Sequence, residues 1–343
     1  MHSISRRAFL KRAGFTAVGL SLADVLRLHP FTTPAHAAGL ANFPDPATMD
    51  RVLTRALARG GDYADLFIER RMQTQIRVAG SAIDSFEHGI LQGGGVRTLR
   101  GEQTGYAYAE TLDPEELARV ADAAAVIASG AGGSAAVPVR AIEFARHVSA
   151  REAIGDATMA QRIAILERVD RAARAVGPAI QQVVIDYADE LQTFAIATSE
   201  GRLAHDELPV IYLRVTVNAQ RDGRAAEGAY RGSLRAGMEF LGGDLPEQAG
   251  RFAAEQALRM LAAQPAPTGE LPVVVAAGGG VMFHEAVGHG LEADGVLRDA
   301  SVFTGKLGQR VGSELVTLYD DSTPPNERGS FNIDDEATSA QRT

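Results

Sequence analysis

The sequence predicts an α+β fold in which a mixed sheet-and-helix module fills most of the chain. Two observations predict it. Segments with strand-like patterns, bounded by glycine turns, lie between longer segments with helical spacing. The chain has 343 residues, 45% of them hydrophobic, so it can bury one large core or two packed domains, and disorder along the whole chain is excluded.

The elements expected first are a helix and several strands. Residues 46–59 have helical spacing, and Gly60-Gly61 ends that helix. Glycines at 80, 89 and 93–95 are interpreted as turns between strands, the last group also as a bend or bulge. The strands expected here cover 63–71, 73–78, 95–99 and 104–109.

Longer helices follow. Asp113-Pro114-Glu115-Glu116 predicts a helix start, with proline in the first turn and acids at the positive end of the dipole. This helix reaches about Ala128, and 129–136 form a loop. Further helices are expected over 158–176 and 245–263, and strands over 182–198 and 210–220. Pro265-Ala266-Pro267 breaks the chain and sets the expected domain boundary.

The last readable elements lie after this break. We expect a short apolar strand over 271–276, a glycine turn at 278–280 and a helix from about Val281. A glycine turn before a helix can hold an anion, but no Lys-Ser or Lys-Thr follows, which excludes a P-loop. A simple turn is the preferred interpretation.

Composition excludes several classes of protein. Cysteine is absent, so the chain has neither a disulfide framework nor a thiolate ligand or nucleophile. Tryptophan is absent and aromatic residues make up 6%, which disfavours a base-stacking platform. A net charge of −9 disfavours general nucleic-acid binding.

The N-terminus has the pattern of an export signal. Residues 5–11, Ser-Arg-Arg-Ala-Phe-Leu-Lys, resemble the twin-arginine signal, and Ala35-His36-Ala37 supplies a small-x-small cleavage site. The run 13–28 is too short and too interrupted to span a membrane stably, and no later stretch is long and apolar enough. We expect a signal peptide over 1–37 and a periplasmic or otherwise exported mature protein. The alternative is a basic amphipathic helix.

The candidate chemistry is carried by His284, Glu285 and His289. Imidazole nitrogen suits zinc, and a neighbouring carboxylate can accept a proton from water at the metal. The histidines are five residues apart, a turn of about 500° in a regular helix, so they would diverge by roughly 140°. They can share one metal ion only if the helix is widened or broken. A π-bulge absorbs one extra residue, and Gly288, which lacks a Cβ, lies where it would form.

These residues resemble the TldD/PmbA metallopeptidase family, on its TldD side. The resemblance covers nearly everything from about residue 48 to 343, and its central motif includes the five-residue histidine spacing. It rests on residues 62–67, 95–97, 105–108, 265–275, 284–294 and 328–338.

The resemblance implies a zinc peptidase that cleaves small or unfolded peptides, with His284 and His289 as zinc ligands and Glu285 as general base. It further implies an N-terminal domain over 38–264 and a β-rich, incomplete metallopeptidase domain over 265–343. Family members form dimers of like chains or of a TldD-type chain with a PmbA-type chain. We therefore expect a homodimer or heterodimer that binds peptide and no nucleic acid.

One feature departs from the family. Its third zinc ligand is a cysteine far downstream of the motif, and this sequence has none. Two histidines alone make a weak zinc site. We therefore expect a fragment or truncated product, or a third ligand from Glu292, Asp294 or a partner chain. Glu292 and Asp294 are also candidates for orienting the histidines, or for a solvated turn. The alternative functions are a non-catalytic, inactive partner subunit and a degenerate fragment without a stable fold.

Other polar residues are weaker candidates. His88, His147 and His205 are isolated in sequence and are interpreted as surface or satisfied histidines. Two acidic runs, Asp320-Asp321 and Asp334-Asp335-Glu336, could bind a hard cation, but solvated turns are preferred. No Gly-x-Ser-x-Gly or Ser-x-x-Lys pattern places a nucleophile.

Overall fold

The structure is a computed structural model that describes residues 43–343. The signal peptide expected over 1–37 therefore lies outside the described residues. Packing divides the chain into two compact units. The first runs to Ala263 and includes Asp321–Arg342, and the second comprises Gln264–Asp320 with Thr343. The domain boundaries expected from the sequence stay a prediction.

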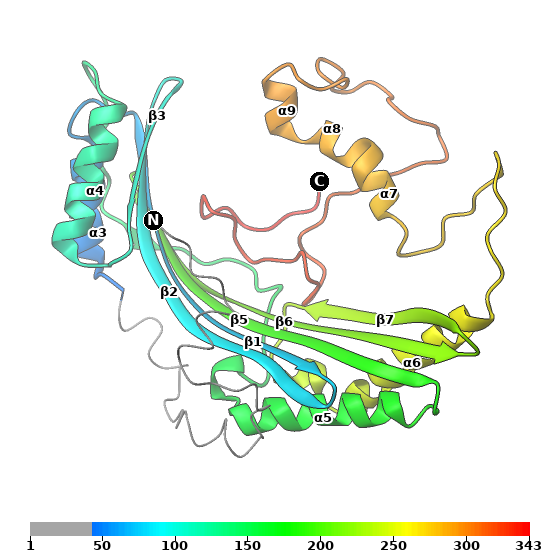
Figure 1. The fold of residues 1–343 in the computed structure, drawn as a ribbon. Helices are drawn as coiled ribbons and strands as arrows, with labels where there is room; N and C mark the ends of the chain where they lie inside the picture. Colours follow the sequence, from blue (N-terminus) through cyan, green and yellow to red (C-terminus); the bar gives the residue numbers. More distant parts are fainter. Residues whose placement is uncertain (1–42) are drawn as a thin grey trace, which may run out of the picture. The chain divides into compact units, whose positions relative to one another are not determined.

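The first unit is built on a seven-stranded sheet with the order β3-β2-β1-β5-β6-β4, in which β7 pairs with β6 (Figure 1). Neighbouring strands are antiparallel, except that β4 pairs with β6 in parallel. The strands are β1 (Tyr63–Ala79), β2 (Ala82–Arg100), β3 (Gln103–Ala109), β4 (Arg140–Ala141), β5 (Ile180–Thr198), β6 (Arg202–Arg221) and β7 (Arg224–Leu234). With its helices, this sheet confirms the predicted α+β class.

In the described part of the first unit there are four long helices, and all four were predicted to within a few residues. They are α3 (Pro46–Leu57), α4 (Pro114–Ile127), α5 (Met159–Arg174) and α6 (Leu245–Ala262). Each has a polar residue at its start: Asp45 and Asp113 accept backbone N–H bonds, and Thr158 forms a capping box with Gln161. A 3₁₀ turn precedes each of the last two helices: η2 (Ile154–Asp156) comes before α5, and η3 (Met238–Leu241) comes before α6.

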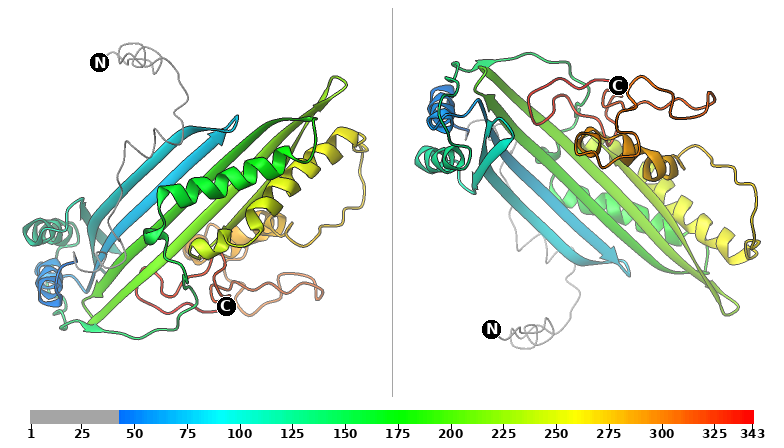
Figure 2. Two further views of the ribbon diagram at one scale, coloured as in Figure 1. Left: turned by 90° about the horizontal axis from the view of Figure 1, so that it is seen from below. Right: turned by 90° about the horizontal axis from the view of Figure 1, so that it is seen from above.

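All four helices cover one face of the sheet. Leu66 and Ile68 of β1 pack with residues of α3 and α4, and Ile76 of the same strand packs with residues of α5 and α6. These residues have even numbers in one strand, so they point to the same side. Figure 2 shows α5 and α6 lying across that face. On the opposite face, Ile333 and Ala337 of the returning C-terminal segment pack on β5 and β6.

Several predicted turns are strand interior instead. The strands expected over 63–71 and 73–78 form the single strand β1, and the turns expected at Gly89 and Gly93–Gly95 were wrong. The register of β1 with β2 is continuous through these glycines. A Cβ on Gly94 would lie 2.7 Å from the side chain of Leu117, so the glycine lets α4 approach closely. Only Gly80 forms the expected turn, with φ +60° beside Ser81 at φ +61°.

Strand β7 was missed by sequence reasoning. Its sequence, RAAEGAYRGSL, has few of the β-branched residues that favour strands. The available signal was Asp222-Gly223, whose positive φ values of 51° and 75° make a tight hairpin turn after β6. A Cβ on Gly228 would lie 2.2 Å from the carbonyl oxygen of Ala253 in α6. This residue of β7 therefore lacks a side chain because α6 packs tightly on the strand.

The second unit holds the predicted helix but not the predicted strand. Its helical elements are α7 (Val281–Phe283), the π turn η4 (His284–Gly288), α8 (His289–Leu291) and α9 (Ala293–Leu297). The strand expected over 271–276 was wrong. These residues have no ladder partner, and Val273 and Val274 are 80% and 95% exposed. A run of apolar residues becomes a strand only where a neighbour pairs with it.

The β-rich character expected over 265–343 is likewise not observed. Among the described residues after Ala263, β pairing is limited to two isolated bridges, Asp321 with Arg342 and Ile333 with Ser339. Within residues 43–343, no helix has both the length and the apolar character needed to cross a membrane.

Candidate metal centre

The predicted distortion of the helix is confirmed. His284–Gly288 forms a π-helical turn between α7 and α8. Because this turn absorbs one extra residue, His284 and His289 reach the same side of the helix, with ring centroids 4.3 Å apart. Candidate ligand atoms of His284, Glu285 and His289 all lie within 4.8 Å of one another, and no other such group of three occurs in the described part of the chain.

Two glycines make room for this arrangement. A Cβ on Gly288 would lie 2.9 Å from Nδ1 of His284, so a larger residue would push that imidazole away. A Cβ on Gly290 would lie 2.9 Å from the ring of Phe303, so this glycine lets the phenylalanine approach α8 closely. The hydroxyl of Ser301 donates to the carbonyl oxygen of Gly290 and fixes the end of the helix. The glycines therefore serve close packing around the histidines.

Glu292 contacts one of the two histidines, whereas Asp294 forms no hydrogen bond or ion pair with either among the described residues. His289 Nδ1 lies 2.9 Å from Oε1 of Glu292, and His289 Nε2 lies 3.7 Å from Oε2 of Glu285. The hydrogen bond to Glu292, and then the charges of Glu292 and Glu285, raise the pKa of His289 above its usual value. Asp294 instead lies 3.7 Å from the guanidinium of Arg298. Glu292 is thus placed to orient His289, as sequence reasoning considered for both acids.

The donor set fits a zinc-type ion. The two imidazole nitrogens are donors that zinc accepts, and the carboxylate of Glu285 lies beside them, where it could accept a proton from water at the ion. Around a zinc ion at about 2.1 Å, two tetrahedral ligand atoms lie roughly 3.4 Å apart, a separation within the 4.8 Å over which the candidate atoms gather. The side chains of Glu285 and His289 are 64% and 55% exposed, and exposed side chains can turn to adjust their positions around an ion. The sequence contributes no cysteine to this set.

The other candidate residues serve local structure. His88 Nδ1 lies 3.1 Å from the hydroxyl of Thr74, and burial lowers the pKa of His205. Asp321 accepts hydrogen bonds from the hydroxyl and backbone of Thr323, which lower its pKa. Asp334 accepts from the backbone N–H groups of Glu336 and Thr338. The acidic runs therefore use carboxylates in turns, the interpretation preferred from sequence.

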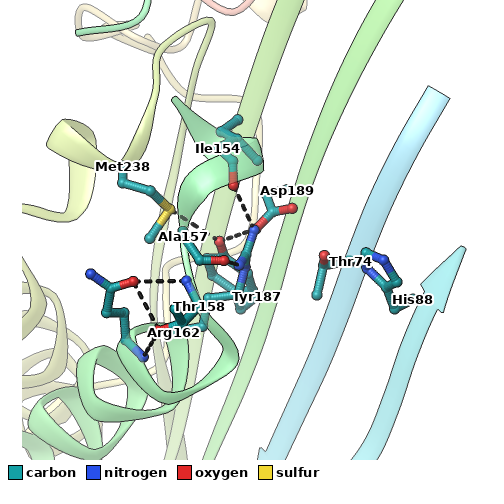
Figure 3. Close-up of polar contacts among 10 residues, drawn as sticks. Thr74, His88, Ile154, Ala157, Thr158, Arg162, Tyr187, Asp189 and Met238 are labelled. Carbon is teal, nitrogen blue, oxygen red and sulfur yellow. Dashed lines mark hydrogen bonds and ion pairs between the residues drawn. The ribbon is translucent and has the colours of Figure 1, made fainter. Parts of the chain in front are cut away.

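Sequence reasoning missed a buried ionic cluster beneath α5 (Figure 3). Arg162 Nε donates to Asp189 at 2.6 Å, its other nitrogens donate to the carbonyl oxygens of Ile154 and Ala157, and Tyr187 donates to Asp189. Burial acts to lower the pKa of Arg162, but the Asp189 carboxylate outweighs it and raises that pKa. The guanidinium is fully paired, so this cluster supports the fold.

The fold and the helix-borne group define a class: an α+β protein with two histidines and a glutamate arranged as in metallopeptidases, where the carboxylate serves as base. Three domains of one family match the sequence: PmbA/TldA metallopeptidase domain 1 over 64–128, the central domain over 152–261 and the C-terminal domain over 268–343. The chain is therefore built from domains of the PmbA/TldD metallopeptidase family.

Named relatives agree with this assignment. The chain is 35% identical over 293 residues to a metalloprotease TldD homolog of Haemophilus influenzae, covering 82% of this chain and 60% of the relative. A metalloprotease TldD homolog of Buchnera aphidicola is 31% identical over 288 residues, with the same coverage of 82% and 60%. The chain thus spans about 60% of the length of these relatives.

Solved structures share the fold. A crystal structure of a Thermotoga maritima protein superposes with a TM-score of 0.72 at 19% identity, covering 87% of this chain and 67% of the other. TldE from Thermococcus kodakarensis gives a TM-score of 0.67 at 15% identity, with coverage of 86% and 66%. At these identities the likeness concerns the fold alone.

Proposed function

We propose that the protein is a zinc-dependent peptidase that hydrolyses small or unfolded peptides. The observation that carries this proposal is the π turn, because it gathers His284, Glu285 and His289 within 4.8 Å despite a spacing that separates them in a regular helix. The metalloprotease names of the relatives support the same reaction class. Since the chain spans about 60% of those relatives, the activity is proposed for the complete protein.

Each residue has a distinct role in this proposal. His284 and His289 would hold zinc, which when bound polarises the scissile carbonyl and acidifies water. Glu285 accepts the proton of the attacking water on its carboxylate and passes it to the leaving amine. Glu292 accepts a hydrogen bond from Nδ1 of His289, which leaves Nε2 with its lone pair available to the metal.

The test is hydrolysis by a Glu285→Gln variant of the complete protein. The amide keeps the shape of the carboxylate but cannot accept the proton, so we expect loss of at least about 100-fold in kcat with zinc content unchanged. Asp294→Asn is the matched control, because Asp294 lies on the next short helix and faces Arg298 instead of the histidines. Full activity in Glu285→Gln would remove this residue from the mechanism.

Assembly and export are separate proposals that rest on the sequence. We propose an exported protein that forms a homodimer, or a heterodimer with a related TldD/PmbA chain. Fractionation of cells that express the full chain tests export, and replacing Arg6 and Arg7 with lysine should retain the protein in the cytoplasm. Light scattering of the purified protein tests the dimer, and a second co-purifying chain would identify the heterodimer.

A further inference from the structure

Arg235 and Arg328 of the first unit act on each other electrostatically, and neither forms an ion pair among the described residues. Arg235 follows β7 directly, and Arg328 belongs to the returning C-terminal segment of the same unit. The Nε atom of Arg235 is buried and has no hydrogen-bond partner. Burial lowers the pKa of Arg235, and the positive charges of Arg328 and Arg71 lower it further. A buried guanidinium donor without a partner is costly, so the arrangement needs an explanation.

Hydrogen bonds hold the backbone of Arg235 beside the segment that carries Arg328. The N–H of Arg235 donates to the carbonyl oxygen of Asn326 at 2.9 Å, and the amide of Asn326 donates back to the carbonyl oxygen of Arg235 at 2.7 Å. Asn326 has φ +60°, a conformation that asparagine tolerates better than most residues. Arg328 follows two residues later. This reciprocal pair of bonds therefore fixes the backbone of Arg235 beside the segment that carries the exposed Arg328, and a fixed backbone is one part of the preorganisation that a binding site requires.

The nearby carboxylates are already engaged. The acids that act on Arg235 most strongly are Glu190 and Asp206. Glu190 lies 3.9 Å from Arg71, which also pairs with Glu69 at 2.8 Å. Asp206 pairs with Arg146 and accepts from the amide of Asn332 at 3.0 Å. Among the described residues, neither Arg235 nor Arg328 has an ion pair or a side-chain hydrogen bond.

We propose that Arg235 and Arg328 bind a carboxylate group of a peptide, its C-terminal carboxylate in the simplest case. A guanidinium presents parallel N–H donors that match the two oxygens of a carboxylate. The choice of a peptide as ligand rests on the proposed function; the anion site itself does not.

The experiment measures binding, not cleavage. N-acetyl-trialanine and its C-terminal amide are titrated by calorimetry into the full protein in the presence of a chelator, so that no hydrolysis occurs. We expect the acid to bind at least about 10-fold more tightly than the amide, and high salt to weaken binding of the acid. Arg235→Gln and Arg328→Gln should each remove the preference for the acid, and Arg235→Lys should restore part of it.

Arg171→Gln is the charge-matched control. Arg171 is an exposed residue of α5, on the helix-covered face of the sheet. The preference for the acid should survive in this variant. Equal binding of acid and amide by the wild type, or an equal loss in Arg171→Gln, would overturn the proposal. Phosphate that competes as well as the acid would overturn the assignment to a carboxylate.

Stability separates a binding role from a structural one. Because the Arg235 guanidinium has no partner among the described residues, Arg235→Gln should leave the melting temperature unchanged or raise it. A fall of several degrees would assign Arg235 to the fold and overturn the proposal. If the protein binds the acid peptide in this titration but hydrolyses no peptide in a separate assay with zinc and without chelator, the anion site is kept and only the peptidase is rejected.

Discussion

The ionic cluster beneath α5 and the His-Glu-His group of the π turn differ in how their polar side chains are buried and paired. Arg162 and Asp189 are 5% and 2% exposed and satisfy each other. His284, Glu285 and His289 are exposed, and their candidate ligand atoms point to a common region. Polar groups that are buried and fully paired stabilise a fold. Polar groups that converge and still have lone pairs available can bind a ligand. The comparison shows that pairing, not polarity, distinguishes the two kinds of polar cluster.

The largest expected effect is on stability. Asp189→Asn leaves the Arg162 guanidinium buried without its counter-charge, and we expect a loss of about 3–5 kcal/mol in the free energy of unfolding. Urea denaturation measures it. Asp186→Asn is the control, since Asp186 lies on the same strand, faces the other side of the sheet and pairs with Arg77 at the surface. That change should cost less than about 1 kcal/mol. Equal losses of unfolding free energy in the two variants would show that the buried pair matters no more to stability than the surface pair.

The second effect concerns metal affinity. Gly288→Val places a Cβ 2.9 Å from Nδ1 of His284, closer than the two atoms can pack, so the imidazole has to move and we expect zinc affinity to fall about 10- to 100-fold. The melting temperature of the first unit should not change, because Gly288 belongs to the second unit. Gly295→Ala is the control, because a Cβ there meets no atom within 4 Å. Unchanged zinc affinity in Gly288→Val would show that the π turn does not hold His284 in place.

A smaller loss is expected at the orienting carboxylate. Glu292→Gln weakens the bond that holds the His289 ring, and zinc affinity should fall about 10-fold. The raised pKa of His289 should also return toward its usual value, since Glu292 is its first cause. Histidine titration by NMR on the metal-free protein measures that shift. Asp294→Asn should change neither quantity, and a loss there as large as in Glu292→Gln would contradict the assigned role.

The smallest effect depends on pH. Glu239 is partly buried, which raises its pKa, but the backbone N–H groups of Arg151 and Glu152 outweigh burial and lower it below the ordinary 4.5. A lowered pKa contributes stability that is present above the unfolded value and is lost as the pH falls through the folded value. Glu239→Gln should therefore cost about 1 kcal/mol at pH 7 and almost nothing near pH 3. An equal cost at both values would exclude a charge effect.

Sequence reasoning predicted those parts of the molecule that local chemistry determines. The start of α4 was predicted because Asp113-Pro114-Glu115-Glu116 places proline and acids in the first helical turn. The π turn was predicted because a spacing of five residues between His284 and His289 conflicts with 3.6 residues per turn. In both cases the cause lies within one turn of helix.

The rest depends on partners that are distant in sequence. Gly93–Gly95 look like turn residues, but close neighbours in β3 and α4 explain why they lack side chains: Ala109 at Gly93, Leu117 at Gly94 and Tyr106 at Gly95. The strand expected over 271–276 has the right residues and no pairing neighbour in the described chain. Arg162 and Asp189 are 27 residues apart, and nothing local indicates that they meet. Periodicity reports which side is apolar, not what packs on it.

The most direct test of the account is zinc binding by the two single-histidine variants. Metal-free wild-type protein is titrated with zinc beside His284→Ala, His289→Ala and the control His147→Ala. Because the π turn presents both imidazoles to one ion, each of the first two variants should lose at least about 100-fold in affinity, while the control keeps one zinc per chain. Loss in only one of the two variants, or in neither, would contradict a shared site.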